Sequence, residues 1–150
     1  MTLDKLNTMS LAGASDWLSH ICAARSWISC MVESRPYKSV QAVREAASKH
    51  WESLSDSDYR EALAAEPVLK ISMIADEVSA DKKLTFNTLN VEYLKKHGFI
   101  FITSIRQRSV EDVINELDER LSRPTDDELS TAKTSFSKLI EKRLQNRLDS

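Results

Sequence analysis

Two arginines near the middle of the chain are the residues with the most distinctive potential chemistry. Arg106 and Arg108 follow an apolar segment, residues 99–105, and directly precede Ser109, which is predicted to begin a helix. Guanidinium groups bind carboxylates and phosphates through forked hydrogen bonds, and free backbone amides at a helix N-terminus favour negative charge. The stretch is therefore consistent with an anion site, with Arg106 as the main contact and Arg108 as a secondary or surface group. On these residues alone, two solvated surface arginines are the favoured interpretation.

Other signatures of catalysis or cofactor binding are not found in the sequence. It contains no glycine-rich phosphate loop and no nucleophile elbow, and its three histidines, His20, His50 and His97, lack the spacing of metal ligands. The two cysteines, Cys22 and Cys30, lie eight residues apart in one helical stretch and are interpreted as reduced core thiols. We therefore expect no metal and no organic cofactor.

Charge and hydropathy narrow the classes of partner. The net charge of −2 gives no general attraction to nucleic acid or to anionic membranes, so neither is expected as a partner. No apolar run approaches the length of a membrane span, and the first residues lack the basic start and apolar core of a secretory signal. The expected location is the cytoplasm.

The elements that would position the arginines are predicted to be helices. Only 2 Gly and 3 Pro occur among 150 residues, and apolar residues recur at spacings of three and four. The predicted helices cover about residues 15–20, 23–33, 39–54, 55–66, 79–97, 109–123 and 125–144, with Ser55 or Ser57 starting the fourth and Thr125 or Asp126 starting the last. Residues 68–76 are ambiguous. Residues 99–105 look like a strand but have no second strand to pair with. The prediction is an all-α, single-domain bundle of about seven helices over residues 1–150, with one buried extended segment.

Several short motifs, taken in order along the chain, resemble one enzyme family. The motifs are Arg35-Pro36-Tyr37 with Ser39; Trp51, Leu54, Asp58-Tyr59 and residues 61–65 before a proline; Leu89-Asn90, Tyr93 and residues 97–102; Arg106, Arg108 and Ser109; and Leu117, Arg120-Leu121, Glu128-Leu129, Ala132, Lys138-Leu139 and Arg143-Leu144. Together they resemble the 2-oxo-4-hydroxy-4-carboxy-5-ureidoimidazoline (OHCU) decarboxylases over about residues 15–148.

The resemblance implies a cofactor-free and metal-free reaction. The family decarboxylates an unstable ureidoimidazoline made from urate, giving (S)-allantoin and carbon dioxide. It is all-helical and often dimeric, so a homodimer and a small anionic, purine-derived ligand are the expected partners. Because loss of carbon dioxide leaves electrons on the ring, the site needs positive charge near the carboxylate and a proton donor near the carbon.

The resemblance also implies site residues, and here the sequence departs from the family pattern. The catalytic histidine of the family precedes a proline. The matching position is Glu66, which is a catalytic candidate, and Pro67 after it is a binding candidate. The following stretch, which should carry a serine and a Glu-Gln pair, is about ten residues short. It retains Ser72 as a binding candidate, with Asp76 and Glu77 as weaker catalytic candidates.

At the other end of the site, the substrate-binding segment is retained. The resemblance assigns ligand contacts to Phe101, Ile102 and the arginine that follows, Arg106. Three hypotheses follow: an altered decarboxylase in which a carboxyl whose pKa is raised by burial donates the proton, a catalytically inactive relative that binds a ligand or protein, and a helical interaction module unconnected with urate. We expect the first to place Glu66 and Arg106 in one cavity.

Overall fold

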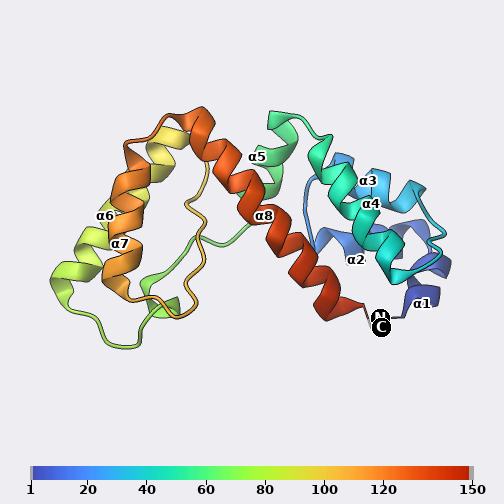
Figure 1. Ribbon diagram of the computed structural model, residues 1–150, viewed down its shortest axis with the longest axis horizontal. Coiled ribbons are helices and arrows are strands. Elements are labelled where there is room, and N and C mark those ends of the chain that lie inside the picture. The colour runs from blue at the N-terminus through green and yellow to red at the C-terminus, as the bar shows by residue number, and fades with distance from the viewer. Residues whose placement is uncertain (1, 149–150) are drawn as a thin grey trace. The chain divides into compact units, whose positions relative to one another are not determined.

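The computed structural model describes residues 2–148, and these confirm the all-helical fold class. The chain is 69% helical, and no strand occurs within the described residues. These residues form two compact units, one made of residues 2–65 and 136–148 and the other of Glu66–Ser135. The expectation of one domain over residues 1–150 stays a prediction, and each unit is described by itself (Figure 1).

The first unit is built from short helices with serine or threonine caps. Its elements are α1 (Leu3–Thr8), α2 (Leu11–Ser19), α3 (Arg25–Glu33), α4 (Val40–Glu52), α5 (Asp56–Ala64) and residues 136–147 of α8 (Thr125–Arg147). Ser39 caps α4, and Ser55 with Asp58 forms a capping box at α5, close to where the sequence predicts these helices to begin. The structure has eight α-helices where about seven were predicted. The sequence analysis did not predict α1, whose six residues bury only Leu6 and are too few to show a helical period.

The core of the first unit is aromatic. Trp51 stacks on Phe136 with ring centroids 4.9 Å apart, and Tyr59 meets the same indole edge-on at 4.7 Å. Buried aromatic polar atoms find backbone acceptors: Trp27 Nε1 donates to Ala47 O at 3.1 Å, and Tyr59 Oη donates to Trp51 O at 2.7 Å. This core is therefore satisfied by neutral hydrogen bonds.

The second unit contains a 3₁₀ turn, η1 (Ile71–Met73), α6 (Ala80–His97), α7 (Val110–Leu121) and residues 125–135 of α8. Helices α6 and α7 lie side by side, as Figure 1 shows. Helix α6 ends where predicted, at Gly98, whose φ of 78° is a left-handed conformation that glycine adopts without steric cost. Ser109, which was predicted to begin a helix, forms a capping box with Asp112 at the start of α7.

Residues 99–105 form the predicted extended segment, which has no strand partner among the described residues. Phe99 and Phe101 are buried, and both pack edge-on against Tyr93 of α6. The residues between and after them are half-buried or exposed, so only one side of the segment faces the core. Burial of the whole segment was expected; the alternation follows from its extended backbone, which points successive side chains to opposite sides.

Candidate functional site

All the site residues predicted from the sequence lie in the second unit. Glu66 is half-buried in a bend, and Pro67 after it is exposed. Ser72 lies in η1, and Asp76 and Glu77 lie in the loop before α6; all three are exposed. These five residues come from one irregular stretch, so their placement depends on loop packing that hydropathy alone does not predict.

A groove of about 440 Å³ lies between this stretch and the outer face of α6. It is lined by residues 68–72, by Asn87, Asn90, Val91 and Leu94 of α6, and by Ile100. The amide of Asn90 donates to Leu69 O at 3.1 Å and so ties the stretch to the helix. Of the catalytic and binding candidates, Ser72 lines this groove, whereas Glu66 and Arg106 do not.

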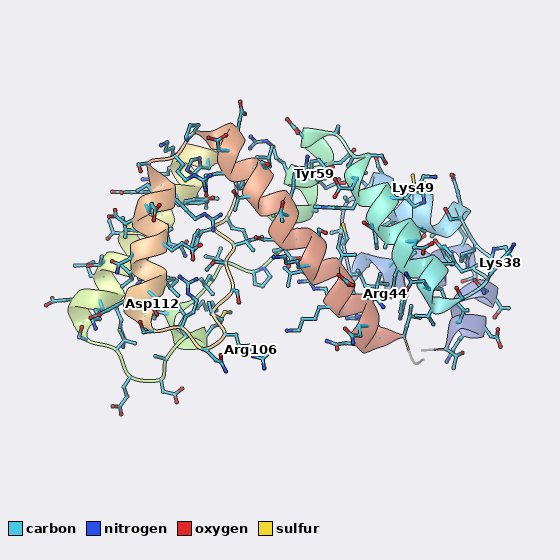
Figure 2. All side chains as sticks on the ribbon, viewed as in Figure 1. Lys38, Arg44, Lys49, Tyr59, Arg106 and Asp112 are labelled. Carbon is cyan, nitrogen blue, oxygen red and sulfur yellow. The ribbon has the colours of Figure 1, made fainter. Side chains whose placement is uncertain are left out.

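Arg106 occupies a different setting from the one expected. Arg106 directly follows the segment that was predicted to be buried, and an extended chain would place its side chain on the same side as that of Arg108. Instead the chain turns, with Arg108 N donating to Ile105 O at 3.2 Å and Gln107 held at a φ of 59°. Arg106 is exposed at the corner of this turn (Figure 2). The alternation argument fails because it holds only for extended backbone.

Arg108 is half-buried and engaged by its own unit. Its Nη1 donates to Glu116 Oε1 at 2.5 Å, to Thr103 Oγ1 at 3.1 Å and to Ser104 O at 2.9 Å. Its other terminal nitrogen donates to Asp112 O at 3.2 Å. A guanidinium neutralised by a carboxylate and spread over four acceptors has little capacity left for a ligand, so Arg106 is the more available of the two cations.

A buried charge network that the sequence analysis did not identify lies directly behind the extended segment. Arg120 Nε donates to Glu128 Oε1 at 2.8 Å, and its Nη1 donates to Glu116 Oε2 at 2.8 Å. The Tyr93 hydroxyl donates to Glu128 Oε1 at 2.6 Å. Arg120 also lies 4.7 Å from the ring centroid of Phe101, in cation–π range, and its Nη1 donates to Ile102 O at 2.9 Å.

The surroundings shift the pKa of several members of this network. Burial raises the pKa of Tyr93, and its hydrogen bond to Glu128 raises it further. Burial alone would raise the pKa of Glu116, but hydrogen bonds from Arg120, Thr103 and Arg108 outweigh it, so the pKa lies below the ordinary value. Glu116 is therefore held in its ionised form.

One sequence signal pointed to this network. Glu116 and Arg120 lie four residues apart on one helix, the spacing of a helical ion pair. Glu128 lies with Asp126 and Asp127 in the first turn of α8, where acidic residues favour the helix N-terminus without any further role. Unlike an ordinary acid of a first turn, its side chain is fully buried, with Arg120 on one oxygen and Arg123 Nη1 at 3.0 Å from the other.

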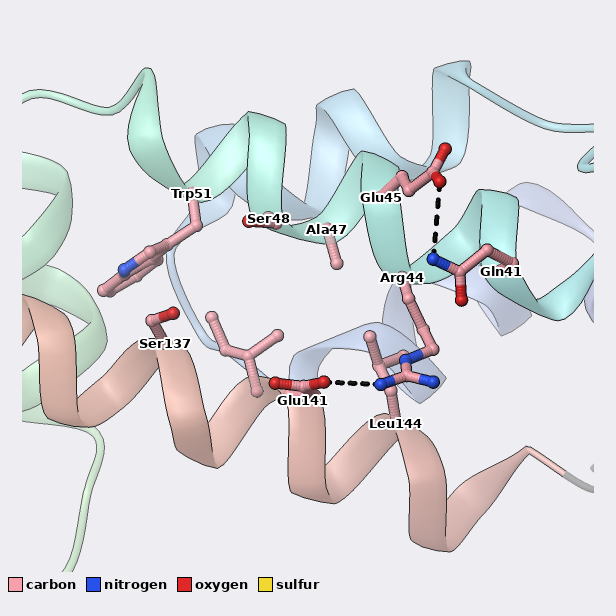
Figure 3. A pocket seen from close by; sticks show the side chains of 10 residues that line it. Gln41, Arg44, Glu45, Ala47, Ser48, Trp51, Ser137, Glu141 and Leu144 are labelled. Atoms are coloured by element: carbon pink, nitrogen blue, oxygen red, sulfur yellow. Dashed lines mark hydrogen bonds and ion pairs between the residues drawn. The ribbon is translucent and has the colours of Figure 1, made fainter.

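A second groove, in the first unit, lies between α4 and the end of α8 (Figure 3). Its volume is about 220 Å³, with Trp51 at one end and the ion pair between Arg44 and Glu141 at its rim. None of the predicted site residues lines it. Its charged side chains are exposed and paired, which is typical of an ordinary solvated helix surface.

The described residues lack two further features. Among residues 2–148, no group of three or more histidine, cysteine, aspartate or glutamate side chains is arranged to hold a metal ion. Within the same residues, no helix combines the length and apolar character needed to cross a bilayer.

The fold and sequence are similar to those of known proteins. A family model for OHCU decarboxylase matches residues 7–145. An OHCU decarboxylase from Haloferax volcanii is 24% identical over 164 positions, covering 100% of this chain and 98% of that protein. A solved OHCU decarboxylase, crystallised in the presence of (S)-allantoin, superposes with a TM-score of 0.75 at 26% identity, covering 88% of this chain and 96% of the other.

Two further relatives are longer than this chain. The uric acid degradation bifunctional protein of Bacillus sp. (strain TB-90) is 26% identical over 159 positions, but these take in 97% of this chain and only 32% of that protein. An (S)-allantoin synthase structure superposes with a TM-score of 0.80 at 21% identity, covering 100% of this chain and 55% of that one. The chain thus spans about a third and about half of these two relatives, respectively.

Proposed function

Since the chain belongs to the OHCU decarboxylase family of urate degradation, we propose that its second unit binds a ureidoimidazoline-type ligand and decarboxylates it weakly or not at all. The observation that carries this proposal is an asymmetry within that unit. The segment with Phe101 and Ile102 is braced by buried charges, with Arg106 exposed beyond it, whereas the sequence resemblance assigns the position of the family's histidine to Glu66.

The chemistry of the proton donor supports reduced activity. As carbon dioxide leaves, the carbon–carbon bond breaks, its electron pair stays on the ring, and the ring carbon must gain a proton. An ionised carboxylate has no proton to donate, and its negative charge also repels a carboxylate substrate. Glu66 therefore suits this step less well than an imidazole.

The length of the chain supports the same proposal. The alignment with the H. volcanii protein runs over 164 positions and takes in all 150 residues of this chain, so about 14 positions fall opposite gaps in it. We place most of this loss in the stretch around Ser72, Asp76 and Glu77, where the family carries its serine and Glu-Gln pair.

The proposal locates the protein in the cytoplasm. Neither Cys22 nor Cys30 takes part in a disulfide, which suits a reducing compartment.

The test is a coupled assay in which freshly generated ureidoimidazoline is supplied and the rate and handedness of allantoin formation are followed. We expect the native protein to stay near the spontaneous background and Glu66→His to exceed it. Asp76→His, a histidine placed in the same loop, is the matched control and should stay at background. A native rate well above background that is lost in Glu66→Ala would show that glutamate has replaced histidine as the proton donor, and the proposal of reduced activity would then be wrong.

A protein-interaction role is the second candidate, supported by the surface around the groove. Large apolar side chains are exposed there by 43–68%: Val68, Met73, Leu84, Val91 and Leu94. A second copy of the chain is the occupant that the family resemblance suggests. Sedimentation of the native protein and of Val91→Glu tests this candidate. It requires the native protein to form a dimer and the charged variant to be dissociated.

A further inference from the structure

We propose that Glu116 is a positioning residue, which fixes the extended segment and Arg108 as one rigid wall of the ligand site and leaves Arg106 as the cation that meets the ligand. The statement about the ligand rests on the proposed function. The statement about the wall rests on the geometry of the second unit alone.

The Glu116 carboxylate joins three parts of that unit. Its Oε1 accepts hydrogen bonds from Thr103 Oγ1 at 2.9 Å and from Arg108 Nη1 at 2.5 Å. Its Oε2 accepts from Arg120 Nη1 at 2.8 Å. One side chain on α7 thus holds a residue of the extended segment, a residue of the turn that follows it, and the buried guanidinium of its own helix.

The result is that three consecutive residues of the segment are each held by this cluster. Arg120 donates to Ile102 O at 2.9 Å, Glu116 accepts from the Thr103 hydroxyl, and Arg108 donates to Ser104 O at 2.9 Å. A segment without a strand partner has no ladder to satisfy its backbone groups, so side chains must do so. The bonds to Ile102 O and Ser104 O do so here, in place of a neighbouring strand, and the bond from the Thr103 hydroxyl anchors the residue between them.

The charges make Glu116 the central member of the cluster. It lies between two guanidinium groups, those of Arg108 and Arg120, and neutralises the repulsion between them. Glu128 cannot replace it, because its oxygens are engaged by Arg120, Tyr93 and Arg123. Without the Glu116 charge, Arg108 is expected to swing toward solvent and release Ser104 and Thr103.

The experiment compares Glu116→Gln with Glu111→Gln. Glu111 lies on the same helix and pairs with Lys82 at 2.7 Å, but its side chain is 68% exposed against 26% for Glu116. Backbone amide hydrogen exchange is measured across the chain, together with calorimetric titration of (S)-allantoin. We expect exchange at residues 102–104 to accelerate at least about tenfold in Glu116→Gln, with α3 unchanged. The affinity for (S)-allantoin should fall about tenfold, and Glu111→Gln should resemble the native protein in both measurements.

Each outcome decides a separate point. If exchange at residues 102–104 is unchanged in Glu116→Gln, the Glu116 carboxylate is dispensable. If exchange accelerates equally over α6, α7 and the segment, the carboxylate is merely structural. Either result would overturn the proposal. If the native protein binds no (S)-allantoin, the proposed function fails, while the exchange result still decides whether Glu116 holds the wall. If Glu116→Gln does not fold, Thr103→Val removes the two hydrogen bonds of the Thr103 hydroxyl, to Glu116 and from Arg108, without changing any charge. It must accelerate exchange locally for the proposal to survive.

Discussion

The two units of this protein bury polar groups in opposite ways. In the first unit the hydrogen-bonding atoms of Trp27, Tyr37 and Tyr59 meet backbone carbonyls, so no charge is carried into that core by these residues. In the second unit, Arg120 and Glu128 are buried as ions. Among residues 2–148, the buried charged or imidazole side chains are these two and His97, all in the second unit.

This difference indicates what each unit is built for. A buried ion pair seldom stabilises a fold more than well-packed apolar residues would, because both ions lose their hydration. Such a pair is retained where it holds something in a fixed geometry, and clusters of this kind are common at functional sites. Here the pair lies behind Phe101 and Ile102, the segment to which ligand contacts are assigned. The first unit accordingly serves as a scaffold, and the second carries the candidate site.

The largest expected effect comes from breaking the buried pair on one side. Glu128→Ala leaves the Arg120 charge without its buried partner and the Tyr93 hydroxyl without its acceptor, so we expect a loss of about 3–5 kcal/mol in the free energy of unfolding. Urea unfolding followed by circular dichroism measures this loss. The control is Glu141→Ala, which breaks the exposed pair with Arg44 and should cost less than about 1 kcal/mol. Similar losses of unfolding free energy in Glu128→Ala and Glu141→Ala would contradict the view that the second unit depends on buried charges.

The matching change in the first unit is Trp51→Leu. It opens space between Tyr59 and Phe136 without leaving any charge unpaired, and we expect a loss of about 2–4 kcal/mol. Calorimetric melting measures the loss, and hydrogen exchange shows where it falls. Because the damage is a cavity in the scaffold, the local protection of residues 102–104 should fall no more than global stability does. A selective loss of protection in that segment would contradict the assignment of scaffold and site.

The fold can be predicted from the sequence better than the site can, and the reason is physical. The helix boundaries at Ser39, Ser55, Gly98 and Ser109 follow from capping and backbone preferences, which are local in sequence, and all four are confirmed. The turn at Gln107 could not be predicted in this way, because a residue other than glycine at positive φ is imposed by tertiary contacts.

The network behind the segment depends on partners far apart in the sequence. Tyr93 and Glu128 are 35 residues apart, and Arg120 reaches Ile102 across 18 residues. The motifs that carry the family resemblance included Tyr93, Arg120 and Glu128, but the resemblance assigned no role to them. The assignments of Glu66, Pro67, Ser72 and the other site candidates stay predictions.

A smaller effect is expected from acid, and its pH range should differ between the units. Burial and then the neighbouring Lys49 lower the pKa of His50 in the first unit, so the folded state favours neutral imidazole. Stability from this group is present above about pH 6.5 and is lost as pH falls through the lower folded pKa. The lowered pKa of Glu116 acts in the same direction but at lower pH, because its contribution to stability is lost only below the ordinary pKa value of 4.5.

Stability curves between pH 7 and 3 for the native protein, His50→Gln and Glu116→Gln measure these two contributions. His50→Gln should flatten the curve just below about pH 6.5, and Glu116→Gln should flatten it below about 4.5. If His50→Gln changed the curve only in the more acidic range and Glu116→Gln only in the less acidic one, the expected difference in pH range between the two units would be wrong.

The smallest expected effect is a gain in stability from Gln107→Gly. Gln107 is the one residue other than glycine with positive φ among the described residues, and it lies in the turn that carries Arg106. For an L-residue this conformation costs roughly 1–2 kcal/mol, because Cβ crowds the backbone oxygen. Glycine avoids that cost but gives up about 0.5–1 kcal/mol through the greater freedom of its unfolded chain.

The net expectation is a gain of about 0.5–1 kcal/mol in the free energy of unfolding, measured by urea titration beside Gln107→Ala, which should give no gain because it keeps the Cβ. Unchanged (S)-allantoin binding in Gln107→Gly would show that the strain is incidental to the site. Weaker binding despite greater stability would show that the side chain at position 107 restricts the turn so that Arg106 is held in place. A loss of stability in Gln107→Gly would instead mean that the Gln107 side chain stabilises the fold by more than its backbone strain costs. Backbone strain would then not be a feature that distinguishes the second unit from the first.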